Sequence, residues 1–201
     1  MGRLSAAHID AVTLDVFGTL ATLVDPIPRL QDLLPEHDRG AIERAFRAEG
    51  AYYRTHVAHG RDAATLAELR ARCVSVFNET LGSSITVDAY VDALTFELLP
   101  GVRDSLDRLR ALGLTLAVVA NWDFGLHEHL ATLGIDNAFA TIVHAAAKPD
   151  PAGILNALHA LGVRAERALH VGDEPADEHA ASAAGVHFLP APLPEAVASL
   201  A

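Results

Sequence analysis

The sequence predicts an α/β protein with a doubly wound, mainly parallel sheet and an inserted domain made of helices. Short apolar runs alternate with amphipathic segments of helical length over the C-terminal half, and one such run also stands near the N-terminus. Between these parts the spacing of apolar residues is helical. Strands that alternate with helices favour parallel pairing, because each returning helix covers one face of the sheet. We therefore expect an α/β core over residues 1–20 and 99–201 and a helical insertion over residues 21–98.

The first strand is predicted over residues 9–17, where a β-rich apolar run ends in Gly18-Thr19. The insertion follows, and residues 27–98 are expected to contain no strand. Its last helix is predicted over residues 87–98. Its two longer helices show side chains at three- or four-residue intervals: Ile42, Phe46, Glu49 and Tyr53, then Leu66, Leu69, Cys73 and Phe77.

The C-terminal half predicts a regular alternation of helices and strands. Its apolar runs and amphipathic segments follow one another in this order: helix 102–112, strand 114–119, helix 126–133, strand 141–143, helix 151–161, strand 168–171, helix 176–184 and strand 186–189. The last of these strands is the last element expected.

Composition and charge exclude several classes of function. The formal net charge of −11 argues against nucleic acid as a partner, because binding to a phosphate backbone needs a basic surface. No apolar run is long enough to cross a bilayer, and residues 1–5 lack the apolar stretch of a signal peptide. A single cysteine, Cys73, leaves no disulfide framework. We expect a cytoplasmic monomer or homodimer that acts on a small molecule and contacts no membrane.

Polar residues follow the predicted strands at the point where each strand ends. In a parallel sheet these carboxyl ends share one edge, where ligands bind. Lys148 is the only lysine in the chain, and its compact ammonium suits a place between two carboxylates. The residues that the strand ends bring to this edge are Asp15, Ala120, Asn121, Lys148, Asp173 and Asp177.

Several carboxylates gathered at one edge would repel one another and raise each other's pKa. A divalent cation and an ammonium relieve that repulsion. Hard cations with carboxylate, carbonyl and water ligands are typically magnesium, so we expect Mg²⁺ as the cofactor.

Four short motifs in these positions resemble the ordered motifs of the haloacid dehalogenase-like hydrolases. They are Asp15-Val16-Phe17-Gly18-Thr19-Leu20, the strand end at Asn121, Lys148-Pro149, and Gly172-Asp173 with Asp177. The resemblance spans the chain from the first to the last strand. It implies a Rossmann-like core, and the helical insertion stands where one subfamily carries a helical cap.

The resemblance also implies a role for each motif residue. Asp15 would be the nucleophile that forms a covalent aspartyl intermediate, and Lys148 would neutralise the transferring group. Magnesium would be bound by Asp15, Asp173 and the backbone carbonyl of Phe17, while Asp177 would orient Lys148 or a metal-bound water. The substrate-binding residues would be Gly18, Thr19, Ala120, Asn121 and Lys148.

Two positions depart from the phosphatase pattern of this family. Phe17 stands where phosphatases carry a second aspartate, which acts as general acid and base and supplies about 10²–10⁴ in rate. Ala120 replaces the usual serine or threonine hydroxyl, so the Asn121 amide or a backbone N–H would have to take over. The replacement for the acid could be Glu174 or a polar group of the insertion: Tyr52, Tyr53, Arg54, His56, His59 and Arg61 around Gly60.

These residues predict a magnesium-dependent phosphohydrolase that acts on a small phosphorylated metabolite through an aspartyl-phosphate on Asp15. A haloacid dehalogenase-type or other non-phosphoryl hydrolase is one alternative, because dehalogenases carry an aromatic residue at the position of Phe17. A weakly active protein that binds a phosphorylated ligand or a partner is another. The phosphonate-cleaving branch is excluded, because it needs a lysine in the cap and the insertion has none.

Overall fold

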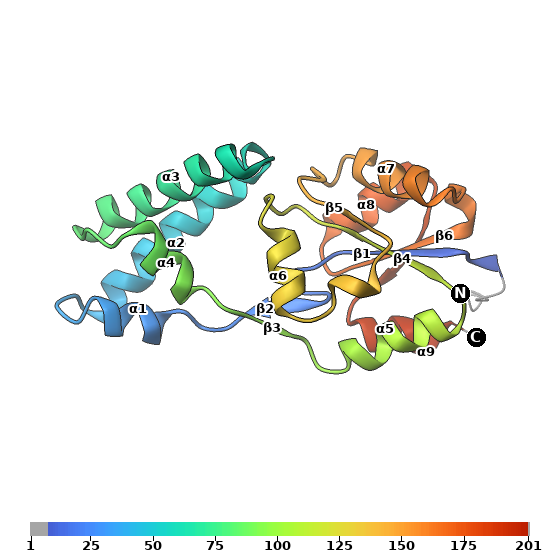
Figure 1. Ribbon diagram of the computed structural model, residues 1–201, viewed down its shortest axis with the longest axis horizontal. Coiled ribbons are helices and arrows are strands. Elements are labelled where there is room, and N and C mark those ends of the chain that lie inside the picture. The colour runs from blue at the N-terminus through green and yellow to red at the C-terminus, as the bar shows by residue number, and fades with distance from the viewer. Residues whose placement is uncertain (1–7, 201) are drawn as a thin grey trace. The chain divides into compact units, whose positions relative to one another are not determined.

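The computed structural model describes residues 8–200 (Figure 1). The chain divides into two compact units, one formed by the chain up to Thr22 and from Glu97 onward, the other by Leu23–Phe96. The divisions predicted from the sequence lie after residue 20 and before residue 99. Residues 1–5, on which the expectation of no signal peptide rests, lie outside the described residues. None of the helices within 8–200 has both the length and the hydropathy that a bilayer span requires.

The first unit is built on a five-stranded sheet in the order β5-β4-β1-β6-β7, and each of these pairings is parallel. The apolar runs form its strands because residues buried on both faces of a sheet are apolar without alternation. The chain runs outward from β1 through β4 to β5 and then returns to the other side of β1, so the switch point lies at β1. The strands are β1 (Ala11–Leu14), β4 (Thr115–Val119), β5 (Thr141–Val143), β6 (Ala168–Gly172) and β7 (His187–Pro190).

Helices cover both faces of this sheet, which confirms the doubly wound fold (Figure 1). The pair α7 and α8 packs on one face, and α5 packs with α9 on the other. The apolar side chains that fill the space under α7 and α8 include Val119, Ile154 and Leu158. The helices of this unit are α5 (Val102–Ala111), α6 (Leu126–Thr132), α7 (Ala152–Leu161), α8 (Pro175–Ala184) and α9 (Leu193–Ser199).

Helix α9 is absent from the sequence prediction, which ended at the last strand. A proline at its first turn and buried Leu193, Ala196 and Val197 at helical spacing carry the signal. The seven residues of α9 contain a single helical repeat of apolar side chains, which is too short a pattern to predict a helix.

The second unit is helical, with α1 (Ile27–Leu33), α2 (Arg39–His56), the 3₁₀ turn η2 (Val57–His59), α3 (Ala63–Leu81) and α4 (Val87–Ala93). Helix α3 begins in a capping box between Asp62 and Thr65 and ends at Gly82 in a left-handed conformation. Phe77 and Tyr90 pack with ring centroids 4.9 Å apart in the apolar core of this unit.

The helix predicted over residues 87–98 is wrong in its last part. Leu94 leaves the helical region, and β3 (Phe96–Leu98) pairs instead with β2 (Ala21–Leu23) in a two-stranded sheet. The N–H of Val24 donates to the Thr95 carbonyl at 2.8 Å. Thr95 and Phe96 favour extended structure, and a neighbouring strand satisfies backbone groups that a frayed helix end would leave open.

Candidate active site

Asp15 follows β1 directly and is 8% exposed, so the strand delivers its carboxylate to the carboxyl edge of the sheet. Its backbone N–H donates to the Val171 carbonyl of the neighbouring strand at 3.0 Å. The side chain of Val16 is buried, whereas Phe17 is 51% exposed. Phe17, two residues after Asp15, therefore presents about half of its side chain to solvent.

Lys148 lies in the loop that follows β5, and its ammonium bridges two carboxylates. Its Nζ is 2.6 Å from Asp15 Oδ1 and 2.5 Å from Asp177 Oδ1. The lysine is 7% exposed, so both ion pairs are shielded from water. A buried ammonium of this kind needs its carboxylates, because an unpaired buried charge is costly.

Asn121 holds the backbone of the lysine in place. Its Nδ2 donates to the Lys148 carbonyl at 2.9 Å, and its Oδ1 accepts from the Lys148 N–H at 2.8 Å. This paired contact joins the loop after β4 to the loop after β5. The amide that was considered as a substitute phosphoryl donor is therefore engaged with the loop of Lys148.

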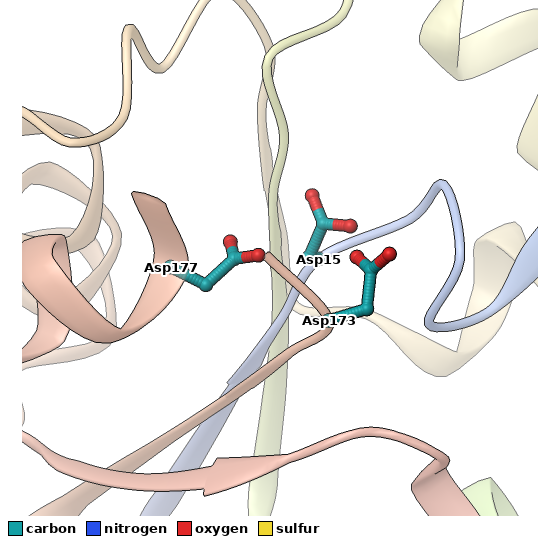
Figure 2. A group of neighbouring side chains, drawn as sticks. All are labelled: Asp15, Asp173 and Asp177. Carbon is teal, nitrogen blue, oxygen red and sulfur yellow. The ribbon is translucent and has the colours of Figure 1, made fainter. Parts of the chain in front are cut away.

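Asp173 stands one residue after β6 and faces the turn after Asp15 (Figure 2). Gly18 in that turn has φ +81°, and a Cβ at Gly18 would meet Asp173 Oδ2 at 2.1 Å. Only glycine allows both this backbone conformation and this close approach. Figure 2 shows the carboxylates of Asp15, Asp173 and Asp177 turned toward one space, and one oxygen of each lies within 4.8 Å of the others.

Asp177 lies in the first turn of α8, where it takes part in a capping box. Its Oδ2 accepts from the N–H of Glu174 at 3.0 Å, and the N–H of Asp177 donates to the Glu174 backbone carbonyl at 2.9 Å. The helix-start carboxylate and the anchor for Lys148 are thus the same side chain. Glu174 stands at the N-cap position of α8, and its role as a proton carrier stays a prediction.

The electrostatic environment shifts the pKa values of the three carboxyl groups in different directions. Burial raises the pKa of Asp15, against the lowering effect of the Lys148 ammonium. Burial also acts to raise the pKa of Asp177, but the hydrogen bond from His170 and the Lys148 charge outweigh it and hold that pKa at about 2. Burial raises the pKa of Asp173 as well. Asp177 is therefore the permanent counter-charge of the lysine.

The donor set fits a hard divalent cation. The cluster contains three carboxylates and one ammonium, which pairs with Asp15 and Asp177, so it holds more negative than positive charge. Its ligand atoms are all oxygens, which suits magnesium rather than metals that favour nitrogen or sulfur. The turn at Gly18 touches Asp173, so the Phe17–Gly18 backbone stands beside the same space.

Two predicted substrate-binding residues lie beneath the surface of the site. Thr19 is fully buried, and its hydroxyl has no hydrogen-bond partner among residues 8–200. Ala120 is 2% exposed, and its N–H donates to the Val143 carbonyl at 3.0 Å as a continuation of the sheet. The Ala120 N–H is thus engaged within the sheet, and a contact of Ala120 with a substrate stays a prediction.

The polar group of the insertion lies within the helical unit, and four of its six members belong to an α-helix rather than a loop. Tyr52, Tyr53, Arg54 and His56 belong to α2, because this helix runs on to His56. The rings of Tyr52 and His56 stack with centroids 4.0 Å apart, and the ring of His59 lies 5.5 Å from that of His56.

His170 is the site residue that the sequence analysis missed. It lies in the middle of β6, is 0% exposed and contacts Asp177 through Nε2 at 3.2 Å. The signal was a histidine inside an apolar strand two residues before Gly172-Asp173. A buried polar side chain there needs partners, and those partners come from the functional site.

The fold and the site define an α/β protein with a cluster of carboxylates at the carboxyl edge of a parallel sheet, beside the switch point. A family model described as haloacid dehalogenase-like hydrolase matches residues 9–185. The chain thus belongs to the haloacid dehalogenase-like hydrolases.

Relatives and solved structures agree with this family. The phosphoglycolate phosphatase of Mesorhizobium japonicum is 31% identical over 85% of this chain and 78% of its own length. The structure of CbbY from Rhodobacter sphaeroides in complex with phosphate is 23% identical and covers 92% of this chain and 86% of its own, with a TM-score of 0.57. The structure of L-2-haloacid dehalogenase from Xanthobacter autotrophicus is 22% identical and covers 90% of this chain and 76% of its own, with a TM-score of 0.65. At these identities the two structures establish the fold alone.

Proposed function

We propose that this hydrolase is a magnesium-dependent phosphohydrolase that acts on a small phosphorylated metabolite through an aspartyl-phosphate on Asp15. The observation that carries the proposal is the buried Lys148 ammonium, which lies 2.6 Å from Asp15 Oδ1 beside two further carboxylates. A fixed cation next to a nucleophilic carboxylate favours attack on an anionic group, because it offsets the repulsion between the two.

The reaction has two displacements at phosphorus. The Asp15 carboxylate attacks the phosphorus atom, the bond to the ester oxygen breaks, and the leaving group departs as its anion with the electron pair of that bond and takes a proton from water. A water molecule then attacks the same phosphorus and gives up a proton to the solvent, the bond to Asp15 breaks, and inorganic phosphate and the free carboxylate result. Lys148 neutralises charge on the phosphoryl oxygens in both displacements, and Asp177 keeps the ammonium in place.

Magnesium, when bound, would act as a Lewis acid that withdraws charge from the phosphoryl oxygens. Asp15 and Asp173 would hold it together with the Phe17 carbonyl, while Asp177 already accepts hydrogen bonds from Lys148, His170 and the Glu174 N–H.

The substrate class follows from the relatives and from the position of Phe17. Relatives of 31% and 32% identity are named phosphoglycolate phosphatase, which makes phosphoglycolate the first compound to test. Phe17 offers no proton to a leaving group, so phosphates whose leaving group is a weak base would react fastest. Acyl and aryl phosphates have such leaving groups.

The helical unit would serve as the cap that selects the substrate. Its candidate contact surface is the stacked Tyr52–His56 pair with His59. In a cap role, His56→Ala should raise KM or narrow the substrate range while the Asp15 chemistry remains. The cytoplasmic location, the absence of membrane and nucleic-acid partners and the monomeric or dimeric state stay predictions.

The test is release of inorganic phosphate from phosphoglycolate, an acyl phosphate and an aryl phosphate, with and without magnesium. Asp15→Asn is the matched control, because it keeps the shape of the side chain and removes its charge. Magnesium-dependent release that disappears in the variant supports the proposal. Absence of release from every compound rejects it.

A carbon–halogen hydrolase is the second candidate, and the exposed Phe17 beside Asp15 favours it. Displacement of halide from carbon needs no acid for the leaving group. Release of halide from a 2-haloacid, without magnesium and dependent on Asp15, would establish this activity instead. If neither phosphate nor halide is released while phosphorylated ligands bind, the chain is a weakly active binding protein.

A further inference from the structure

The side chain of His170 lies in a buried hydrogen-bonded chain beneath the site. His170 on β6 is paired in register with Thr13 on β1. Its Nδ1 lies 2.8 Å from Thr13 Oγ1, and its Nε2 lies 3.2 Å from Asp177 Oδ1. Thr13 and His170 are both 0% exposed. Each ring nitrogen therefore has a protein partner.

The partners decide which ring nitrogen carries the hydrogen. Asp177 is an ionised carboxylate and can only accept a hydrogen bond, so Nε2 must donate to it. Burial lowers the pKa of His170 and keeps the ring neutral, which leaves a lone pair on Nδ1. That lone pair accepts from the Thr13 hydroxyl. Hydrogen bonds thus run in one direction, from Thr13 through His170 to Asp177.

This chain restrains the carboxylate that holds the lysine. Asp177 Oδ1 accepts from both His170 Nε2 and Lys148 Nζ, and Oδ2 accepts from the N–H of Glu174. Gly172 stands so close that a Cβ there would meet Asp177 Cγ at 2.3 Å. Three donors and this close contact leave the carboxylate one orientation. The Lys148 ammonium is held by that orientation at 2.6 Å from Asp15 Oδ1.

We propose that His170 is a positioning residue, which acts through Asp177 to aim the Lys148 ammonium at Asp15. Its catalytic consequence rests on the proposed function, whereas the placement of the ammonium does not. Without the imidazole N–H, Asp177 Oδ1 loses the donor that opposes the pull of the lysine. The carboxylate then rotates, and the ammonium samples positions farther from Asp15.

The chain offers a direct probe of this placement, because Lys148 is its only lysine. Full-length protein labelled with ¹³C,¹⁵N-lysine, without a lysine-containing tag, gives a single side-chain ammonium signal in NMR spectra. In the wild type we expect a sharp ¹⁵Nζ signal, because a buried ammonium bound by two carboxylates exchanges slowly with water. In His170→Met we expect the signal to shift and to broaden. In His170→Gln, whose amide N–H can reach Asp177, we expect it to return toward its original position.

Thr13 supplies a second pair of variants that leaves the imidazole in place. Thr13→Val removes the hydroxyl at nearly constant shape and should move the Lys148 signal in the same direction as His170→Met, by a smaller amount. Thr13→Ser keeps the hydroxyl and should leave the signal near that of the wild type. This pair tests the chain even if His170→Met does not fold.

The kinetic readout separates positioning from binding. We expect His170→Met to lower kcat about 10–100-fold with little change in KM. Losses of this size are typical when a residue that orients a group of the active site is replaced. His170→Gln should recover most of that loss. An unchanged Lys148 signal in folded His170→Met, or equal signals in Thr13→Val and Thr13→Ser, overturns the proposal. If the wild type releases no phosphate, the proposed function fails, and the NMR comparison still decides the placement.

Discussion

Gly18 and Asp173 lie so close that a Cβ on Gly18 would overlap Asp173 Oδ2, at a distance of 2.1 Å. Gly18→Ala should therefore move Asp173 and weaken magnesium binding, as well as destabilise the fold. We expect a loss of about 1–2 kcal/mol from the left-handed backbone, and roughly 1–3 kcal/mol more from the overlap. Urea denaturation measures the loss of stability, and calorimetric titration with Mg²⁺ measures the change in magnesium affinity.

Gly162 provides the matched control for this change. It has a similar φ, +67°, and its Cβ would meet nothing within 4 Å. Gly162→Ala should show the backbone cost alone and leave magnesium binding intact. Equal losses of stability and equal magnesium affinity in the two variants would contradict the role given to the close contact.

Lys148→Met should destabilise the protein by about 3–5 kcal/mol in magnesium-free buffer, because it leaves Asp15 and Asp177 without their shared cation. Chemical denaturation at neutral pH measures this. Arg110→Met is the control, since Arg110 is exposed and 4.0 Å from Asp107, and should change the stability by less than about 1 kcal/mol. In a double-mutant cycle, Asp15→Asn should cost less in the Lys148→Met background than in the wild type. Additive costs would mean that the two side chains are not coupled.

Phe17→Asp should supply the missing acid and accelerate the hydrolysis of alkyl phosphates by about 10²-fold or more. In the wild type, kcat/KM for a series of aryl phosphates should fall steeply as the pKa of the leaving phenol rises. The variant should show a flatter dependence, because the added carboxyl protonates the leaving oxygen. Phe17→Asn introduces a side chain of the same shape as aspartate but without an acidic proton, so this variant should keep the steep dependence. A shallow dependence in the wild type would show that another group already provides the proton.

Glu49 makes the stability of the helical unit sensitive to pH. Burial raises the pKa of Glu49 above its value of 4.5 in the unfolded chain, so the folded state prefers the neutral carboxyl. The neutral Glu49 carboxyl contributes its full stabilisation below pH 4.5. This stabilisation is lost as the pH rises through the raised folded-state pKa of Glu49. Glu49→Gln stays neutral, so its stability relative to the wild type should increase from about pH 4.5 upward and then level off. Urea denaturation between pH 4 and pH 9 measures this.

Glu68 lies exposed on α3 in the same unit and serves as the control. Glu68→Gln should follow the wild-type stability at every pH. A constant difference between Glu49→Gln and the wild type across the whole range would mean that Glu49 keeps its charge at no cost in the folded protein.

The positions at which the chain changes between strand and helix could be read from the sequence because they depend on local spacing. Apolar runs predicted each of the five strands of the parallel sheet, and the order of elements predicted the doubly wound topology. The errors fell where local signals were short. Helix α9 has a single repeat of apolar side chains, and β3 forms only because β2 pairs with it.

The sequence by itself determined which residues stand at the strand ends, since parallel strands bring their carboxyl ends to one edge. Only the tertiary structure decided which partner each polar side chain takes there. Lys148 pairs with residues 133 and 29 positions away, Asn121 binds the Lys148 backbone, and Glu174 stands at the N-cap of its own helix. A hydrogen bond needs a donor and an acceptor within about 3 Å in space, and spacing along the chain does not encode that distance across loops.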